Sequence, residues 1–104
     1  MEIRYKNNKL RKLLEDGVAL QRTYGKRQSL EIIARLGELL AAESLADIFA
    51  IPQARAHWAV GNWNGHLSLD IVHPYRIYLL PENGDRTNPR TITIVCVIKI
   101  HDPH

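Results

Sequence analysis

The stretch TITIVCVIKI, residues 91–100, decides the fold class of this chain. β-branched residues fill most of its positions, and they favour an extended strand over a helix. Alternation places one set of side chains on one face, namely Ile92, Ile94, Cys96, Ile98 and Ile100. The other face receives Thr91, Thr93, Val95, Val97 and Lys99. Both faces are largely apolar, which predicts an interior strand of a sheet.

The same period of two extends back to Arg55. It predicts strands over residues 56–60, 66–72 and 75–80. The turn residues Gly61-Asn62-Trp63-Asn64-Gly65 form a tight loop between the first two strands. A polar loop over residues 81–90 precedes the final strand. The second half of the chain is therefore predicted to be a β-sheet.

The first half is predicted to be one strand followed by helices. Residues 1–6 alternate as a strand, and Asn7-Asn8 then caps a brief helix that Gly17 closes. The longest helix runs from Lys26 to Glu43, and Ser44 caps a short helix over residues 45–50. In the long helix Glu31, Arg35 and Glu38 are expected to face away from the core. Its buried stripe is expected to contain Leu30, Ile33, Ala34, Gly37, Leu40 and Ala41.

These elements predict an α+β fold, with two N-terminal helices packed on a mostly antiparallel twisted sheet. The length of 104 residues allows one hydrophobic core, so residues 1–104 are predicted to form a single domain. No apolar stretch approaches the length of a membrane span, and no signal-peptide pattern opens the chain. We therefore expect a cytoplasmic protein without a membrane partner.

The charge is mildly basic and unevenly distributed. The net charge is +3, and residues 1–27 carry eight Lys and Arg against three Asp and Glu. A basic N-terminal face suits a polyanion or an acidic partner, although a solvated helix face explains it equally well. The single cysteine, Cys96, lies in an apolar run and is expected to be a buried small hydrophobe rather than a reactive thiol.

Several kinds of chemistry have no signature in this sequence. It lacks a Gly-rich phosphate loop, a nucleophile elbow and a pair of cysteines for zinc. His101, Asp102 and His104 are the only clustered candidate metal ligands, and metal sites need ordered supporting groups. No metal or other cofactor is therefore predicted.

The histidines and arginines suit metal-free acid–base chemistry on RNA. Histidine serves as base or acid near neutral pH, and arginine binds phosphate through a planar fork of donors. Arg76 lies in a predicted strand, which is an accurate mount for a phosphate contact; an ion pair with Asp70 is the structural alternative. For His57, His66 and His73, an ordinary surface or capping role is the alternative to catalysis.

The two tryptophans have different expected roles. Trp58 lies in a predicted strand and is expected in the core. Trp63 lies in a polar loop, where it suits a stacking platform for a base or a contact for a partner.

Four segments together resemble HigB-type toxins of the RelE/ParE superfamily, which include plasmid maintenance killer proteins. The opening Ile3–Asp16 resembles their start "F-K-x-K-x-L-x-x-L-x-E", and Gly61–Leu69 resembles their hairpin "G-D-R-x-G-x-x-S-I". His73-Pro74-Tyr75-Arg76-Ile77 resembles the following strand "H-P-Y-R-L". Lys99–His104 resembles the terminus "E-I-x-D-Y-H". The four matches occur in the family's order along nearly the whole chain.

This resemblance implies the toxin of a bacterial type II toxin–antitoxin pair. Many HigB-like members cleave mRNA in the ribosomal A site and thereby inhibit translation. A HigA-like helix-turn-helix antitoxin neutralises such toxins, and the complex contacts promoter DNA through the antitoxin. The implied activity is a metal-independent endoribonuclease, with the ribosome, mRNA and the antitoxin as partners.

The resemblance also assigns residues. His57 matches the histidine before the hairpin, Arg76 the phosphate-side arginine and His104 the carboxy-terminal histidine, and these three are the expected catalytic residues. The expected substrate-binding residues are Arg55, Trp63, His66, Lys99 and Asp102. Many members have a lysine where this chain has Val60 and a tyrosine where it has Pro103. Arg55 or His66 is the expected substitute for the missing cation.

Two other functions stay open at this point. A protein of this fold without catalysis would act through its antitoxin, by binding it and co-repressing the promoter. A ParE-like inhibitor of DNA gyrase is the third possibility, disfavoured by the carboxy-terminal His104.

Overall fold

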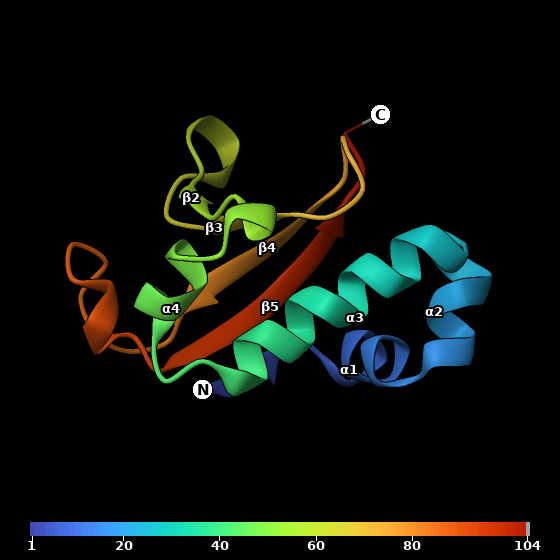
Figure 1. Ribbon diagram of the computed structural model, residues 1–104, viewed down its shortest axis with the longest axis horizontal. Helices are drawn as coiled ribbons and strands as arrows, with labels where there is room; N and C mark the ends of the chain where they lie inside the picture. Colours follow the sequence, from blue (N-terminus) through green and yellow to red (C-terminus); the bar gives the residue numbers. More distant parts are fainter. Residues whose placement is uncertain (104) are drawn as a thin grey trace.

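Strand β5 (Ile94–His101) is an interior strand of the sheet, as its composition predicts. The computed structural model describes residues 1–103. On one side β5 pairs in parallel with β1 (Glu2–Tyr5), and on the other it pairs antiparallel with β4 (Arg76–Pro81). Two further antiparallel strands follow, β3 (Leu67–Asp70) and β2 (His57–Trp58). The order is β1-β5-β4-β3-β2 (Figure 1), so the sheet is mostly antiparallel and the predicted α+β class is confirmed.

A β-bulge in β5 breaks the predicted alternation. Tyr78 of β4 lies opposite Lys99, whereas the next residue, Leu79, lies opposite Val97. Ile98 is therefore an extra residue in β5, and such an insertion reverses the facing of the residues on one side of it. The prediction that one face carries every second residue from Ile92 to Ile100 is wrong. The buried face instead carries, across the bulge, Val95, Val97 and Ile100.

Four helices precede β2: α1 (Asn8–Glu15), α2 (Gly17–Tyr24), α3 (Lys26–Ala41) and α4 (Leu45–Phe49). The predicted cap is confirmed, because the Asn7 side chain accepts the Leu10 N–H at 2.8 Å. Helix α2 is absent from the prediction of two N-terminal helices. Asp16 starts it by accepting the N–H groups of the second and third residues that follow, at 3.0 and 3.1 Å. Gly17 therefore opens a helix rather than ending one.

The predicted buried stripe of α3 is wrong. The helix buries Ile32, Leu36 and Leu39, while Leu30, Ile33 and Leu40 are exposed. Arg35, which was expected to face solvent, is only 5% exposed. It forms an ion pair with Glu38 one turn later, with Nε and Oε1 2.7 Å apart. Because this pair neutralises the buried guanidinium, the helix can turn its charged side towards the sheet.

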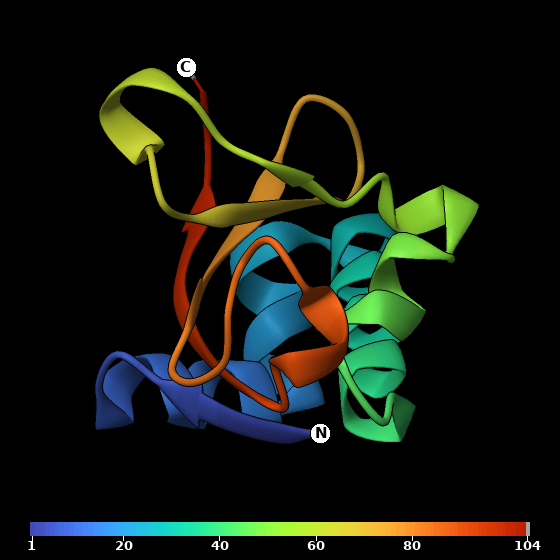
Figure 2. The same cartoon turned by 90° about the vertical axis from the view of Figure 1, so that its left-hand side faces the viewer.

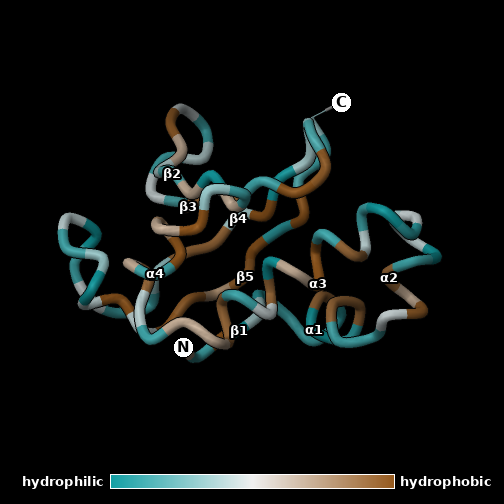
Figure 3. The backbone as a smooth tube through the Cα atoms, in the orientation of Figure 1, coloured by the Kyte–Doolittle hydropathy of each residue, from teal (hydrophilic) through white to brown (hydrophobic). Residues whose placement is uncertain are grey.

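The core lies between the helices and one face of the sheet. Figure 2 shows α3 and α4 on one side, while the connection between β2 and β3 projects away from them. Along the tube in Figure 3, hydrophobic segments follow β4, β5 and the facing helices. The fully buried side chains of this core include Leu20, Ile32, Leu39, Ile48, Leu67, Leu69, Ile77, Leu79, Val95 and Val97. All four α-helices contribute side chains to this core and therefore lie on the same side of the sheet.

Three 3₁₀ turns complete the chain: η1 (Pro52–Ala54), η2 (Gly61–Trp63) and η3 (Pro89–Thr91). The first predicted strand of the second half is shorter than expected, because only His57–Trp58 pair with β3. The α3 helix is tied to the turn before β4 by Gln28, whose side chain accepts the Val72 N–H at 2.8 Å. Arg76 follows this fixed turn directly. Within residues 1–103, no helix has the length and apolarity needed to cross a bilayer.

Candidate functional site

The face of the sheet without helices carries two rows of polar side chains across the strands. The strand register aligns His57 with Ser68, Ser68 with Tyr78 and Tyr78 with Lys99. A second row aligns Asp70 with Arg76 and Arg76 with His101. Residues aligned in this way lie on the same face, about 5 Å apart from strand to strand. We call these two rows the open face.

Neither Arg76 nor Lys99, the arginine and lysine of these two rows, forms an ion pair within residues 1–103. Asp70, the neighbour expected as the ion-pair partner of Arg76, instead contacts Arg55, with Nε and Oδ2 3.4 Å apart. Arg55 reaches Asp70 from the end of η1, where it adopts a left-handed backbone conformation with φ of 43°. The half-buried guanidinium of Arg76 therefore has its donors available to an anion.

Two imidazoles, that of His57 in the open face and that of His66 next to it, each direct Nδ1 at a backbone carbonyl. His57 Nδ1 lies 2.8 Å from the Arg55 carbonyl, and His66 Nδ1 lies 3.2 Å from the Trp63 carbonyl. A carbonyl only accepts hydrogen bonds, so each Nδ1 carries the proton and each neutral ring keeps its lone pair on Nε2. The His57 ring is exposed and can take a proton from a bound group. His73 is exposed in the turn before β4 and lies outside both rows.

Trp63 lies over the centre of the open face. Its ring stacks on that of Tyr78, with centroids 4.2 Å apart and an interplanar angle of 0°. The rings of His66 and His101 meet it edge-on at 5.0 and 5.5 Å, and Lys99 Nζ lies 5.8 Å from its centroid. The structure thus brings together three expected substrate-binding residues, Trp63, His66 and Lys99, around Tyr78.

Trp58 lies at the edge of the core, half-buried, and its prediction as a core residue is confirmed in that limited sense. Its ring packs against Phe49, with centroids 6.1 Å apart. The guanidinium of Arg86 lies 4.7 Å from the Trp58 centroid and covers its outer surface. This tryptophan is therefore occupied by contacts within the chain.

Two buried polar atoms of the open face lack a hydrogen-bond partner among the described residues, Ser68 Oγ and His101 Nδ1. Ser68 is completely buried, and its neighbour across the strands is Tyr78. Buried polar groups are nearly always paired, because leaving one unpaired costs about 1–3 kcal/mol. His101 lies directly opposite Arg76, whereas Ser68 lies in the neighbouring row opposite Tyr78.

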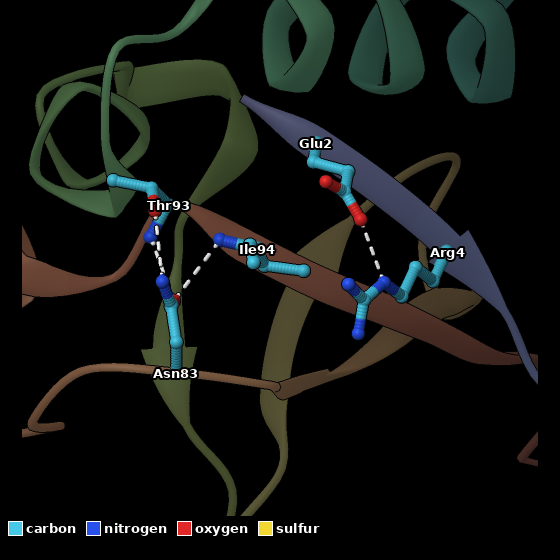
Figure 4. A network of polar contacts seen from close by, with 5 residues as sticks. All are labelled: Glu2, Arg4, Asn83, Thr93 and Ile94. Carbon is cyan, nitrogen blue, oxygen red and sulfur yellow. Dashed lines mark hydrogen bonds and ion pairs between the residues drawn. The ribbon is translucent and has the colours of Figure 1, made fainter.

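The other end of the sheet, outside the open face, has different polar contacts (Figure 4). Arg4 of β1 pairs with Glu2, with Nε and Oε2 2.6 Å apart, so its charge is already matched. Asn83 fixes the start of β5 by accepting the N–H groups of Thr93 and Ile94 at 3.0 and 3.1 Å. Cys96 lies nearby and is buried, as expected; burial and then the Glu82 carboxylate raise the pKa of its thiol. At this end Arg4 is thus paired with Glu2, and the Cys96 thiol is buried.

A basic groove of about 380 Å³ runs between α1 and β5. Its apolar floor is formed by side chains that include Leu10, Leu13 and Ile98. Lys6, Lys9 and Lys99 supply the charge at its walls. Part of the basic N-terminal surface expected from the sequence therefore lines a groove and does not belong to a uniformly solvated helix face.

Asp102, an expected substrate-binding residue, is not part of the open face. Asp102 borders a small pocket beside Thr23, Gln28 and Tyr75, on the helical side of the sheet. His104 lies outside the described residues. Conversely, sequence reasoning missed Tyr78 and His101 as site residues. Alternation from Arg76 would have found Tyr78, whereas the bulge in β5 obscures the facing of His101.

Neither a model of any known protein family nor any curated protein matches this chain. Among residues 1–103, no group of three or more His, Cys, Asp or Glu side chains is arranged to hold a metal ion. The open face is therefore interpreted from its own chemistry, which is one unpaired arginine, exposed and half-buried imidazoles, a lysine and stacked aromatic rings.

Proposed function

We propose that this chain is the toxin of a bacterial type II toxin–antitoxin pair and cleaves mRNA on the ribosome without a metal ion. The observation that carries the proposal is Arg76, an arginine without a carboxylate partner, placed directly opposite His101 on the open face. An arginine fork binds phosphate oxygens, and flanking imidazoles move the protons that cleavage requires. The resemblance of four segments to HigB-type toxins supports the same activity.

The proposed reaction is attack by the ribose 2′-hydroxyl on the adjacent phosphorus. His57 Nε2 takes the hydroxyl proton, the 2′-oxygen bonds to phosphorus, and the P–O5′ bond breaks. A carboxy-terminal imidazole, either His101 of β5 or the later residue His104, returns a proton to the leaving 5′-oxygen. Arg76 binds the phosphate oxygens as their negative charge grows, and the product is a 2′,3′-cyclic phosphate.

The stacked rings are proposed to hold a base next to the scissile phosphate. Trp63 presents an aromatic surface on a loop, with Lys99 and His66 at its edges. Base stacking on such a ring tolerates different sequences and contributes about 1–3 kcal/mol per base. Arg55 or His66 is proposed to substitute for the lysine that HigB-type toxins carry at the position of Val60. Arg55 pairs with Asp70, which lies opposite Arg76 on the neighbouring strand.

The proposed partners are the ribosome with its mRNA and a HigA-like helix-turn-helix antitoxin, all in the cytoplasm. The basic groove between α1 and β5 supports the antitoxin, since its lysines and apolar floor suit an acidic amphipathic segment. Promoter DNA would be contacted through the antitoxin in the complex. No cofactor enters the proposed chemistry.

The test is cleavage of mRNA on translating ribosomes by the wild type, Arg76→Ala, His57→Ala, His101→Ala and His104→Ala. Loss of one preorganised charge contact lowers the rate by about 10²–10³-fold, and that is the effect expected for Arg76→Ala. Arg90→Ala removes an equal charge from the exposed η3 turn and is expected to leave cleavage unchanged. Equal activity of the wild type, Arg76→Ala and His104→Ala would overturn the proposed mechanism.

A second candidate function is binding without catalysis, in which the protein acts only through its antitoxin at the promoter. The observation that favours it is the Trp63 ring, which covers Tyr78 and leaves that residue only 4% exposed. Induced expression in bacteria separates the two functions. Arrest of translation by the wild type but not by Arg76→Ala supports cleavage, whereas normal growth with both supports the binding function.

A further inference from the structure

Helix α3 carries a hydrophobic surface that nothing in the described chain covers. Leu30, Ile33 and Leu40 are 58%, 46% and 65% exposed. Ala34, Gly37 and Ala41 are exposed between and beside them. These six residues, which we call the α3 stripe, recur at helical spacing along a helix of 16 residues, about 24 Å long. A contiguous apolar stripe of this kind on a soluble domain is typical of a contact surface.

Gly37 at the middle of the stripe has no explanation within one copy of the chain. Glycine in the interior of a helix is destabilising relative to alanine, because it loses more conformational freedom on folding. A Cβ atom at Gly37 would meet nothing within 4 Å, so the packing of a single chain does not require glycine there. A small residue on a helix surface allows another helix to approach closely, because the distance between packed helices depends on the side chains at the contact.

The α3 stripe is complementary to itself when two copies pair antiparallel about a two-fold axis between Ala34 and Gly37. Ala34 of one copy then lies opposite Gly37 of the other, and Leu30 lies opposite Ala41. The small central pair allows the two helices to approach closely. Ile33 and Leu40 flank this central contact from both copies, so large side chains are placed around small ones.

The charges at the two ends of α3 also match in this arrangement. Lys26 and Arg27 begin the helix, while Glu43 and Asp47 follow its end, and all four are exposed. None of the ion pairs among residues 1–103 uses these four side chains. Antiparallel pairing brings the basic end of each α3 to the acidic end of the other, whereas parallel pairing would place like charges together.

We propose that a second copy of this chain covers the α3 stripe, forming a two-fold dimer through antiparallel packing of α3 on α3. Such an interface is isologous, because the same surface is used by both copies. The open face lies on the other side of the sheet from this helix and would remain accessible in the dimer (Figure 2). The inference rests on the surface of α3 and does not depend on RNA cleavage.

The test is the mass of the purified full chain by light scattering and sedimentation over a wide concentration series. The dimer is expected to approach twice the 11.9 kDa of one chain. Ile33→Glu and Leu40→Glu each place a charge in the proposed contact and are expected to give monomers. Val60→Glu makes the same kind of change at a side chain that is 85% exposed in the β2–β3 connection, and it should leave the dimer intact.

A charge exchange provides an independent variant in case a stripe substitution disturbs folding. Arg27→Glu places acidic groups against the acidic end of the second copy and is expected to weaken the dimer. Adding Glu43→Arg to the same chain restores opposite charges and should restore the dimer. A chain that stays monomeric throughout the concentration series overturns the proposal, even if another protein occupies the stripe. A dimer unaffected by Ile33→Glu and Leu40→Glu overturns it as well.

Discussion

Two adjacent leucines of α3 offer a sharp test of which face of this helix is buried. Leu39 is fully buried in the core, whereas Leu40 is 65% exposed. Truncation of a buried leucine to alanine removes apolar contacts and leaves a cavity, which costs about 2–5 kcal/mol. Since Leu39 has no exposed surface, we expect Leu39→Ala to lower the free energy of unfolding by about 3 kcal/mol. Leu40→Ala should change it by less than about 0.5 kcal/mol, as surface substitutions usually do.

The assay is urea unfolding followed by circular dichroism, at a protein concentration low enough for the chain to be monomeric. In a domain of this size, about 3 kcal/mol corresponds to a melting temperature lower by roughly 12–24 °C, so thermal unfolding provides a second readout. The sequence pattern by itself predicts the opposite order, because it places Leu40 in the core. Equal destabilisation by the two substitutions, or a larger effect of Leu40→Ala, would refute the orientation of α3.

Three further predictions concern the sheet and its loops. Burial raises the pKa of the Cys96 thiol, so we expect no alkylation of folded protein at neutral pH and rapid alkylation after unfolding in urea. The backbone N–H and hydroxyl of Thr87 hold the pKa of Asp85 below its usual range. Asp85→Asn should therefore destabilise the protein at neutral pH, by a difference from wild type that shrinks as the pH falls below about 4 and the carboxyl becomes protonated; urea titrations at several pH values measure this. Trp63→Ala should remove the near-ultraviolet circular dichroism of the stacked pair with Tyr78, whereas Trp58→Ala should retain it; an unchanged spectrum in Trp63→Ala would contradict the stack.

The sequence predicts the sheet better than it predicts the helices. Residues 91–100 are rich in β-branched side chains, and both faces are apolar, so an interior strand is the arrangement that buries them. The bulge at Ile98 depends on how β4 pairs with β5, which no local pattern specifies. In α3, two apolar stripes share one helix, and the pattern alone does not determine which of them faces the sheet. The hydrophobic pattern places the charged side of α3 in solvent, but the Arg35–Glu38 ion pair makes burial of that side possible.

In the candidate site too, the local sequence pattern predicts some residues, whereas others depend on tertiary contacts. Arg76 was predicted to be a phosphate-binding residue on a strand. Asp70 does not form an ion pair with Arg76 because it pairs with Arg55, which belongs to a different segment and has a left-handed backbone conformation. The Arg55–Asp70 ion pair is a tertiary contact, so the local sequence pattern does not predict it. Tyr78 follows from alternation on the same strand. His101 does not, because its facing depends on the bulge and its unpaired Nδ1 depends on burial by neighbouring rings.

The central claim is that RNA binds to the open face of the sheet, and its most direct measurement is an NMR titration with a short RNA. The RNA carries a 2′-O-methyl group at every ribose, so that it binds without being cleaved. The account predicts the largest chemical-shift changes at Arg76, Tyr78, Lys99 and His101 and in the β2–β3 connection. Changes confined to Lys6, Lys9, Leu10 and Leu13 of the basic groove, or to α3, would contradict it.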